Sequence, residues 1–114
     1  MAFVKNDNGK NRLDLLPVEA LLEIGKVLTF GAQKYSDENW RQGCAWSRYY
    51  AAAQRHLYAW KYGDDLDEDS GLSHLAHANC CILFLLTSSL LGLGTDDRWR
   101  KPKAAERLHG DKNV

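Results

Sequence analysis

The residues best equipped for chemistry lie in an acidic segment and in the histidines that follow it. Five of the six residues Asp64–Asp69 are acidic, and His74 and His77 come shortly after them. Residues three apart share one face of a helix, so both imidazoles would point the same way. Carboxylates suit hard cations such as Mg²⁺, and imidazoles extend the range to Mn²⁺ and other transition metals. The pattern predicts a divalent-metal site, with a solvated acidic loop as the alternative.

His56 precedes the acidic segment and strengthens this prediction. If residues 46–63 and 71–91 form an antiparallel helical hairpin, His56 and His74 lie at comparable distances from its turn and can face one another. The alternative is a core histidine hydrogen-bonded to a tyrosine. The candidate metal ligands of the hairpin are therefore His56, Asp67, His74 and His77.

A second pair of carboxylates, Glu19 and Glu23, is four residues apart in the segment 17–30. Glu23 falls beside the apolar stripe of that segment, where a carboxylate needs a metal, a partner or a raised pKa. Metal binding by this pair is one interpretation. A salt bridge from Glu23 to Lys26 or Arg55 is the other.

Basic side chains that could hold phosphates are scattered along the chain, at Lys10, Arg12, Lys34 and Arg55. They match no phosphate-binding loop motif, although Arg and Lys clamp phosphates wherever they converge. Tyr35 and Trp40 offer aromatic faces on which a base could stack, and the Asn39 amide could read its edge. A packed aromatic loop is the alternative for these three residues.

Three predicted helices position these groups. Apolar residues repeat at helical spacing over about 17–30, or as far as Tyr35, and again over about 46–63. Ser70 can cap a third helix over about 71–91, which is apolar on most sides and should be buried nearly all round. No strand pattern appears, so the predicted fold class is an all-α helical bundle.

Length and charge narrow the class of protein. The chain has 114 residues, enough for one domain, with a polar, basic arm at 1–16 and a basic tail at 95–114 that holds a short helix after Pro102. Fifteen Lys and Arg balance fifteen Asp and Glu, which argues against a long nucleic acid as partner. Three helices expose more apolar surface than one such bundle covers, so we expect an oligomer, a homodimer or homotetramer.

Two further features concern location. The charge-free stretch Ser70–Thr95 is interrupted by polar residues, which favours a buried helix or an interface over a membrane span. Three cysteines make an odd number and suggest no disulfide scaffold. The N-terminus shows no secretory signal, so the expected location is cytoplasmic.

Four ordered runs together resemble a known family over about residues 5–90: Gly9–Leu21, Leu28–Tyr35 with Asn39-Trp40, Arg55–Leu57, and Asp67–Ala78. They are similar to the phage-borne dATP/dGTP diphosphohydrolases, or MazZ-like proteins, which are related to the MazG-like all-α nucleoside triphosphate pyrophosphohydrolases. The resemblance implies an oligomeric phage enzyme of the host cytoplasm that uses Mg²⁺ or Mn²⁺. Its expected reaction converts dGTP or dATP to the deoxynucleoside monophosphate and pyrophosphate.

One departure affects the metal ligands. MazG-like enzymes carry Glu-x-x-Glu on one helix and Glu-x-x-Asp on the next, and aligning the apolar runs places His74 and His77 where Glu-x-x-Asp would fall. The metal shell would then combine histidines with Asp67 and Asp69, or it would use Glu19 and Glu23 instead. Both arrangements remain open at this point.

The resemblance also gives the mechanism that we expect. Water attacks the α-phosphorus, oriented by Glu23 or Asp69 as general base. Lys10, Arg12, Lys34 and Arg55 hold the phosphates, Trp40 or Tyr35 stacks on the purine, and Asn39 reads its edge. A non-enzymatic phage accessory protein is the rival from another class. An HD-type triphosphohydrolase is a second rival, but the adjacent His-Asp pair of such sites is absent.

Overall fold

The structure is a computed structural model, and it describes residues 2–102. Within that range the fold is all-α, as the sequence predicts, and no β-strand is present. The helix expected after Pro102 lies outside the described residues. The elements in chain order are the 3₁₀ helix η1 (Leu13–Leu15), α1 (Val18–Lys34), the 3₁₀ helix η2 (Asn39–Gln42), α2 (Trp46–Lys61) and α3 (His74–Leu91).

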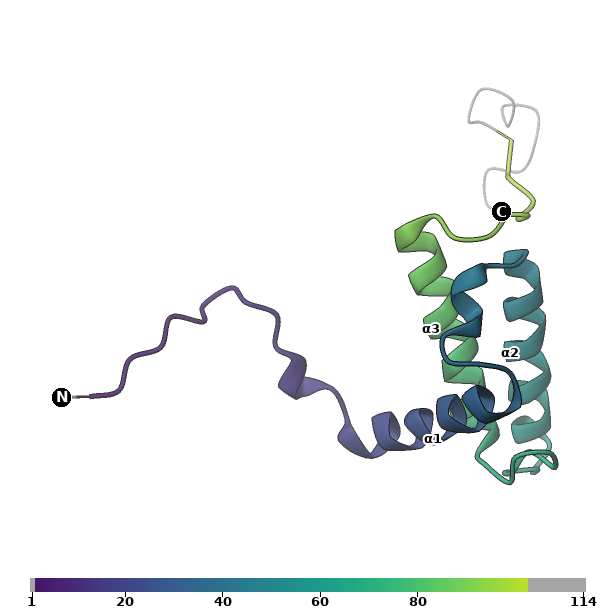
Figure 1. Ribbon diagram of the computed structural model, residues 1–114, viewed down its shortest axis with the longest axis horizontal. Coiled ribbons are helices and arrows are strands. Elements are labelled where there is room, and N and C mark those ends of the chain that lie inside the picture. Colours follow the sequence, from purple (N-terminus) through teal and green to yellow (C-terminus); the bar gives the residue numbers. More distant parts are fainter. Residues whose placement is uncertain (1, 103–114) are drawn as a thin grey trace.

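Helices α2 and α3 form the antiparallel hairpin that the sequence predicts, and α1 crosses it near the turn (Figure 1). A small core lies where α1 meets α3. It consists of the buried residues Ile24, Val27, Ala76 and Cys80, with Leu72 and Phe84 packed against them. The core therefore fixes the middle of α1 beside the first turns of α3.

The start of α3 differs from the prediction. The helix begins at His74, and its cap is Ser73, whose hydroxyl accepts a hydrogen bond from the Leu75 N–H at 3.1 Å. Ser70 does not cap it, because the Ser70 N–H and hydroxyl donate to the carboxylate of Asp67. The loop thus uses one serine to shape itself and a second to start the helix.

The prediction that α3 is buried nearly all round is wrong for this single chain. Ile82, Leu86 and Leu90, which follow one another at four-residue spacing, are 49%, 55% and 74% exposed. The reason is that α1 and α2 are the helices that pack on α3 within residues 2–102, and they leave the face with these three residues uncovered. By length and composition α3 could also cross a membrane, a test that core helices of other proteins pass as well.

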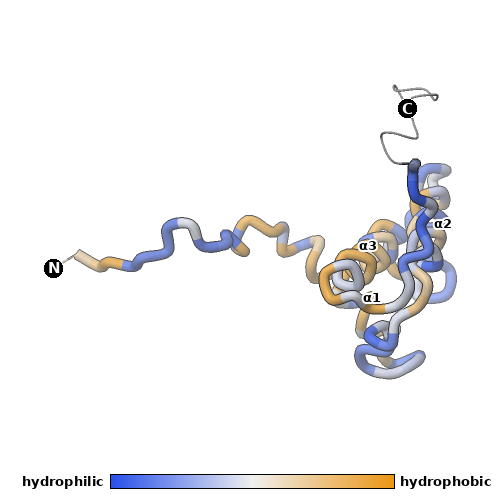
Figure 2. Tube along the Cα trace, turned by 90° about the horizontal axis from the view of Figure 1, so that it is seen from above, coloured by the Kyte–Doolittle hydropathy of each residue, from blue (hydrophilic) through white to orange (hydrophobic). Residues whose placement is uncertain are grey.

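Residues 2–16 form an arm that runs away from the helices (Figure 1). Every residue of the arm is exposed, and its apolar stretches alternate with polar ones (Figure 2). The arm raises the radius of gyration to 19.1 Å, whereas a compact chain of this length would have about 13 Å.

The segment after α3 returns to the start of α2. The Thr95 N–H donates to the Cys44 carbonyl at 3.2 Å, and the Trp46 N–H donates to the Thr95 carbonyl at 3.0 Å. Gly94, with φ +71°, passes so close to Cys44 that a side chain there would meet its backbone. These two hydrogen bonds anchor the end of the loop that carries η2.

Candidate functional site

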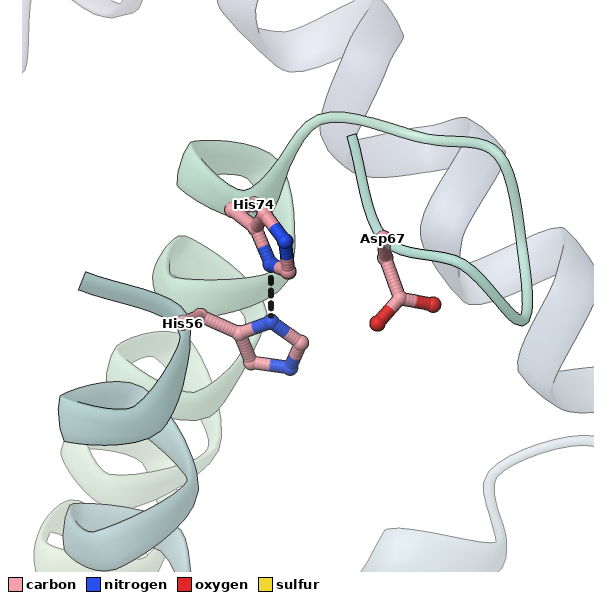
Figure 3. A group of neighbouring side chains, drawn as sticks. All are labelled: His56, Asp67 and His74. Carbon is pink, nitrogen blue, oxygen red and sulfur yellow. Dashed lines mark hydrogen bonds between the residues drawn. The ribbon is translucent and has the colours of Figure 1, made fainter. Parts of the chain in front are cut away.

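Three histidines meet at the turn end of the α2–α3 hairpin. His56 comes from the last turns of α2, and His74 and His77 come from the first turn of α3. The Nδ1 atoms of His56 and His74 are 2.9 Å apart (Figure 3). The rings of His56 and His77 are stacked, with centroids 4.6 Å apart and 13° between their planes. The equal distances of His56 and His74 from the turn therefore do bring these two imidazoles together, with 46° between their planes.

Asp67 brings a carboxylate to the same place. Figure 3 shows it projecting from the loop toward His56 and His74, and one ligand atom from each of these three residues lies within 4.8 Å of the others. Two hydrogen bonds from Ser70, at 2.9 and 3.1 Å, hold its Oδ2. Within residues 2–102 its other oxygen has no protein hydrogen bond, so it is available to a ligand.

The hydrogen bonds around the cluster set the imidazole tautomers. His74 Nε2 lies 3.3 Å from Asp64 Oδ2, so it carries the proton that it donates there, and Nδ1 keeps a lone pair. His77 Nε2 lies 2.7 Å from Ser70 Oγ. Because that hydroxyl donates to Asp67, His77 donates to the hydroxyl. A carboxylate behind a histidine in this way is how proteins orient metal-binding imidazoles.

Burial and hydrogen bonding also set the charges. Desolvation lowers the pKa of His56, and the neighbouring His77 lowers it further. Desolvation lowers the pKa of His77 as well. Burial acts to raise the pKa of Asp67, but the two Ser70 hydrogen bonds and the nearby His77 and His56 together outweigh it, and the pKa is lowered. Neutral imidazoles beside an ionised carboxylate are the protonation states that bind a metal.

A cavity of about 940 Å³ adjoins the cluster, which is within the range of small-molecule sites. His56, Asp67 and His77 line one part of it. An aromatic group lines another part, where Trp40 stacks on Phe84 at 5.1 Å between centroids and Tyr49 packs against the same Phe84 at 5.4 Å. The cavity therefore has potential metal ligands on one side and aromatic rings on another.

Several other predicted site residues line this cavity: Lys34, Tyr35, Asn39, Trp40 and Asp69. Lys34 Nζ lies 3.0 Å from Asp69 Oδ2, and this partner raises the pKa of Lys34. Trp40 is enclosed on the protein side by Phe84 and by Arg41, whose guanidinium lies 4.4 Å from the ring centroid. Tyr35 is 66% exposed and has more free ring surface.

The structure does not bring the remaining candidates to the cavity. Glu19 and Glu23 line a separate hollow beside α1, and Glu23 pairs with Lys26 at 2.7 Å, one of the two partners that its position allows. Arg55 is exposed and lies outside the cavity lining. Lys10 and Arg12 lie on the arm.

Three residues of the site escape the sequence reasoning. Ser70 holds Asp67, and Tyr49 and Phe84 complete the aromatic wall. A signal exists for Phe84, because it follows His77 by seven residues, two helical turns on the same face of α3. Ser70 gives no comparable signal, since its role depends on how the loop folds.

Comparison with known proteins assigns the chain to a family. Residues 2–98 match the family described as dATP/dGTP diphosphohydrolase, N-terminal. The chain belongs to this family. A curated member, the dATP/dGTP diphosphohydrolase of Salmonella phage PMBT28, is 36% identical over 85 residues, which are 75% of this chain and 29% of that protein. The chain thus spans less than a third of the relative's length. No solved structure matches it.

Membership of the dATP/dGTP diphosphohydrolase family confirms the resemblance that the sequence shows. The matched span contains all three histidines, the acidic loop and every residue that lines the cavity. The features that could do chemistry therefore lie inside the part of the chain that the family shares.

Proposed function

We propose that this chain is a metal-dependent purine deoxynucleoside triphosphate pyrophosphohydrolase, which converts dGTP or dATP to the monophosphate and pyrophosphate. The observation that carries the proposal is the position of the His56–Asp67–His74 cluster at the edge of a nucleotide-sized cavity. The family and the name of the phage relative support the same reaction class.

The donor set fits one of the two expected ions better than the other. Mg²⁺ prefers oxygen ligands and octahedral geometry, whereas two imidazoles with one carboxylate suit Mn²⁺ and its neighbours. His56, His74 and Asp67 would hold the ion, with His74 oriented by Asp64. A bound divalent ion would neutralise phosphate charge and acidify water. The distant Glu19 and Glu23 are not needed for this shell.

Asp69 is the better of the two candidate general bases. It lines the cavity, whereas Glu23 lies in a separate hollow and is paired with Lys26. In the free protein Lys34 neutralises Asp69. A phosphate that attracts Lys34 would release Asp69 to take the proton of the attacking water, whose oxygen bonds to the α-phosphorus as the bond to pyrophosphate breaks. Binding of substrate would thereby activate the base.

Tyr35 is the better of the two stacking candidates. The Trp40 ring is already packed by Phe84 and Arg41, so its role is to form the wall of the cavity. The Tyr35 ring lines the same cavity and is largely exposed. The Asn39 amide, also in the lining, would read the edge of the purine.

Proteins of this kind would act in the host cytoplasm.

The experiment is product analysis with dGTP and dATP in the presence of Mn²⁺ or Mg²⁺. We expect pyrophosphate and the monophosphate, with faster turnover in Mn²⁺. Triphosphate and deoxynucleoside would indicate an HD-type reaction instead. No turnover of any nucleoside triphosphate, together with no thermal shift by Mn²⁺, would favour the non-enzymatic accessory protein.

A further inference from the structure

The cavity contains too few cations for a triphosphate. Its charged lining residues are Lys34, Asp37, Glu38, Asp67 and Asp69. The one cation among them is held by Asp69, and the nearby Arg41 is held by Glu38 at 2.9 Å. One divalent ion does not balance the negative charge of these carboxylates together with that of a substrate of about four negative charges. Further cations must come from outside the lining.

The chain's own arm does not reach the cavity. Lys10 and Arg12 precede α1, and the lining of the cavity begins at Val27, deep within that helix. The rise of α1 from Val18 to Val27 alone separates them by about 14 Å. The arm then continues away from the hairpin (Figure 1). Among the described residues 2–102 no further cation lines the cavity, so a second copy of the chain, whose arm projects in the same way, is a source of the missing cations.

The arm has local structure, but it packs on no other segment of the described part of the chain. A turn closed by Lys10 N–H and Asp7 carbonyl precedes η1. The leucines of η1 and its flank are at least half exposed: Leu13 66%, Leu15 69% and Leu16 50%. Shaped apolar segments that project from a domain commonly pack on a second copy, as in exchanged arms.

A matching apolar surface exists on the body. Ile82, Leu86 and Leu90 form an exposed stripe along α3, and contiguous apolar surface of this kind marks an interaction site. The body also carries the acidic cavity lining, which complements the Lys10 ammonium of the arm, while Arg12 is paired with Asp14 at 2.8 Å in the single chain and would exchange that partner for a phosphate. Both an apolar and an electrostatic attraction therefore lead from the arm to the body of another copy.

We propose that two copies of this chain associate through the α3 stripe and exchange arms, so that Lys10 and Arg12 of each copy enter the cavity of the other. The site of one copy is then incomplete without its partner. This inference rests on the proposed function for the triphosphate, whose charge calls for further cations and which the two cations would hold.

The first test measures mass and needs no activity. Light scattering on the full chain should give a dimer or a multiple of it, and the triple variant L13S/L15S/L16S should shift toward the monomer while circular dichroism shows its helices intact. A wild-type monomer at about 50 μM, a weak dissociation constant for an obligate assembly, would overturn the inference. So would a monomer that sediments with anionic lipid vesicles, which would assign the stripe to a membrane.

The second test mixes two defective variants. K10A/R12A has an intact metal cluster, and H74A has an intact arm, so each should be nearly inactive alone. After subunit exchange an equal mixture should recover about a quarter of wild-type turnover, the share of intact sites in randomly paired dimers. The control is R48A, which removes an exposed cation outside the cavity and should keep full activity.

The two proposals fail differently in this design. An active wild type whose variant mixture stays inactive would overturn arm exchange and leave the proposed function standing. An inactive wild type would overturn the proposed function. Arm exchange would then be decided by the mass measurement, together with calorimetric titration of inorganic triphosphate into wild type and K10A/R12A, which should bind at least tenfold more weakly.

Discussion

The Nδ1 atoms of His56 and His74 face each other 2.9 Å apart across the α2–α3 hairpin. Asp64 accepts a hydrogen bond from the Nε2–H of His74, so the proton between the two Nδ1 atoms belongs to His56. If the His56 proton moved from Nδ1 to Nε2, both Nδ1 lone pairs would be free, and His56, His74 and Asp67 could hold a divalent ion that neutralises phosphate charge.

Metal binding should depend on Asp67 and not on its neighbour Asp65. D67N removes a carboxylate of the cluster, and D65N removes an exposed one outside it. We expect Mn²⁺ to raise the melting temperature of wild type and of D65N, and to leave D67N nearly unchanged. Equal shifts in the two variants would show that the ion binds elsewhere in the acidic loop.

The two serines of the loop should separate metal affinity from helix stability. S70A removes the hydroxyl bonds to Asp67 and His77 and keeps the Ser70 N–H bond to Asp67, so Mn²⁺ affinity should fall about tenfold. S73A removes the α3 cap and should lower the free energy of unfolding by about 1 kcal/mol without changing that affinity. Calorimetry and urea unfolding measure the two effects. Restoration of binding in S70T supports the hydroxyl as the cause.

Stability should fall in mild acid. The pKa values of His56 and His77 are lowered in the folded state, chiefly by burial. Between the folded value and the unfolded value near 6.5, the unfolded chain binds more protons, so folding weakens as the pH falls. We expect the melting temperature of the metal-free chain to drop between pH 7.5 and 5.5. The drop should be smaller in H77Q, and an equal drop would assign it to other groups.

Tyr35 should contribute to nucleotide binding, and Tyr50 should not. Both rings are largely exposed, but Tyr35 lines the cavity and Tyr50 lies on α2 outside it. Loss of one base–aromatic stack costs about 1–3 kcal/mol, so Y35A should raise KM for dGTP at least fivefold with kcat little changed. Y50A should match wild type. A lower kcat at constant KM in Y35A would contradict a stacking role.

The sequence predicts the elements well where one periodic pattern decides them. Helices α1 and α2 start and end close to the expected positions, and the equal spacing of His56 and His74 from the turn correctly brings them together. The sequence does not predict the outcome where two residues of similar capping propensity compete for the same position. Ser70 and Ser73 are both good caps, and only the folded loop, in which Asp67 claims Ser70, distinguishes them.

In the candidate site, too, some features follow from the sequence and others only from the folded arrangement. Glu23 sits beside an apolar stripe, but α1 turns it away from the hairpin and toward Lys26. The burial of α3 was overestimated because its composition reflects surfaces that one chain does not cover. Composition therefore indicates that a surface is apolar, and only the arrangement of elements shows what is left to cover it.

Pyrophosphate release from dGTP by wild type, D67N and H74A tests the central claim most directly. We predict Mn²⁺-dependent formation of equimolar pyrophosphate and dGMP by wild type, and a loss of at least a hundredfold in both variants at unchanged helix content. Equal rates in all three proteins, or release of triphosphate in place of pyrophosphate, would contradict the account of this cluster as the catalytic metal site.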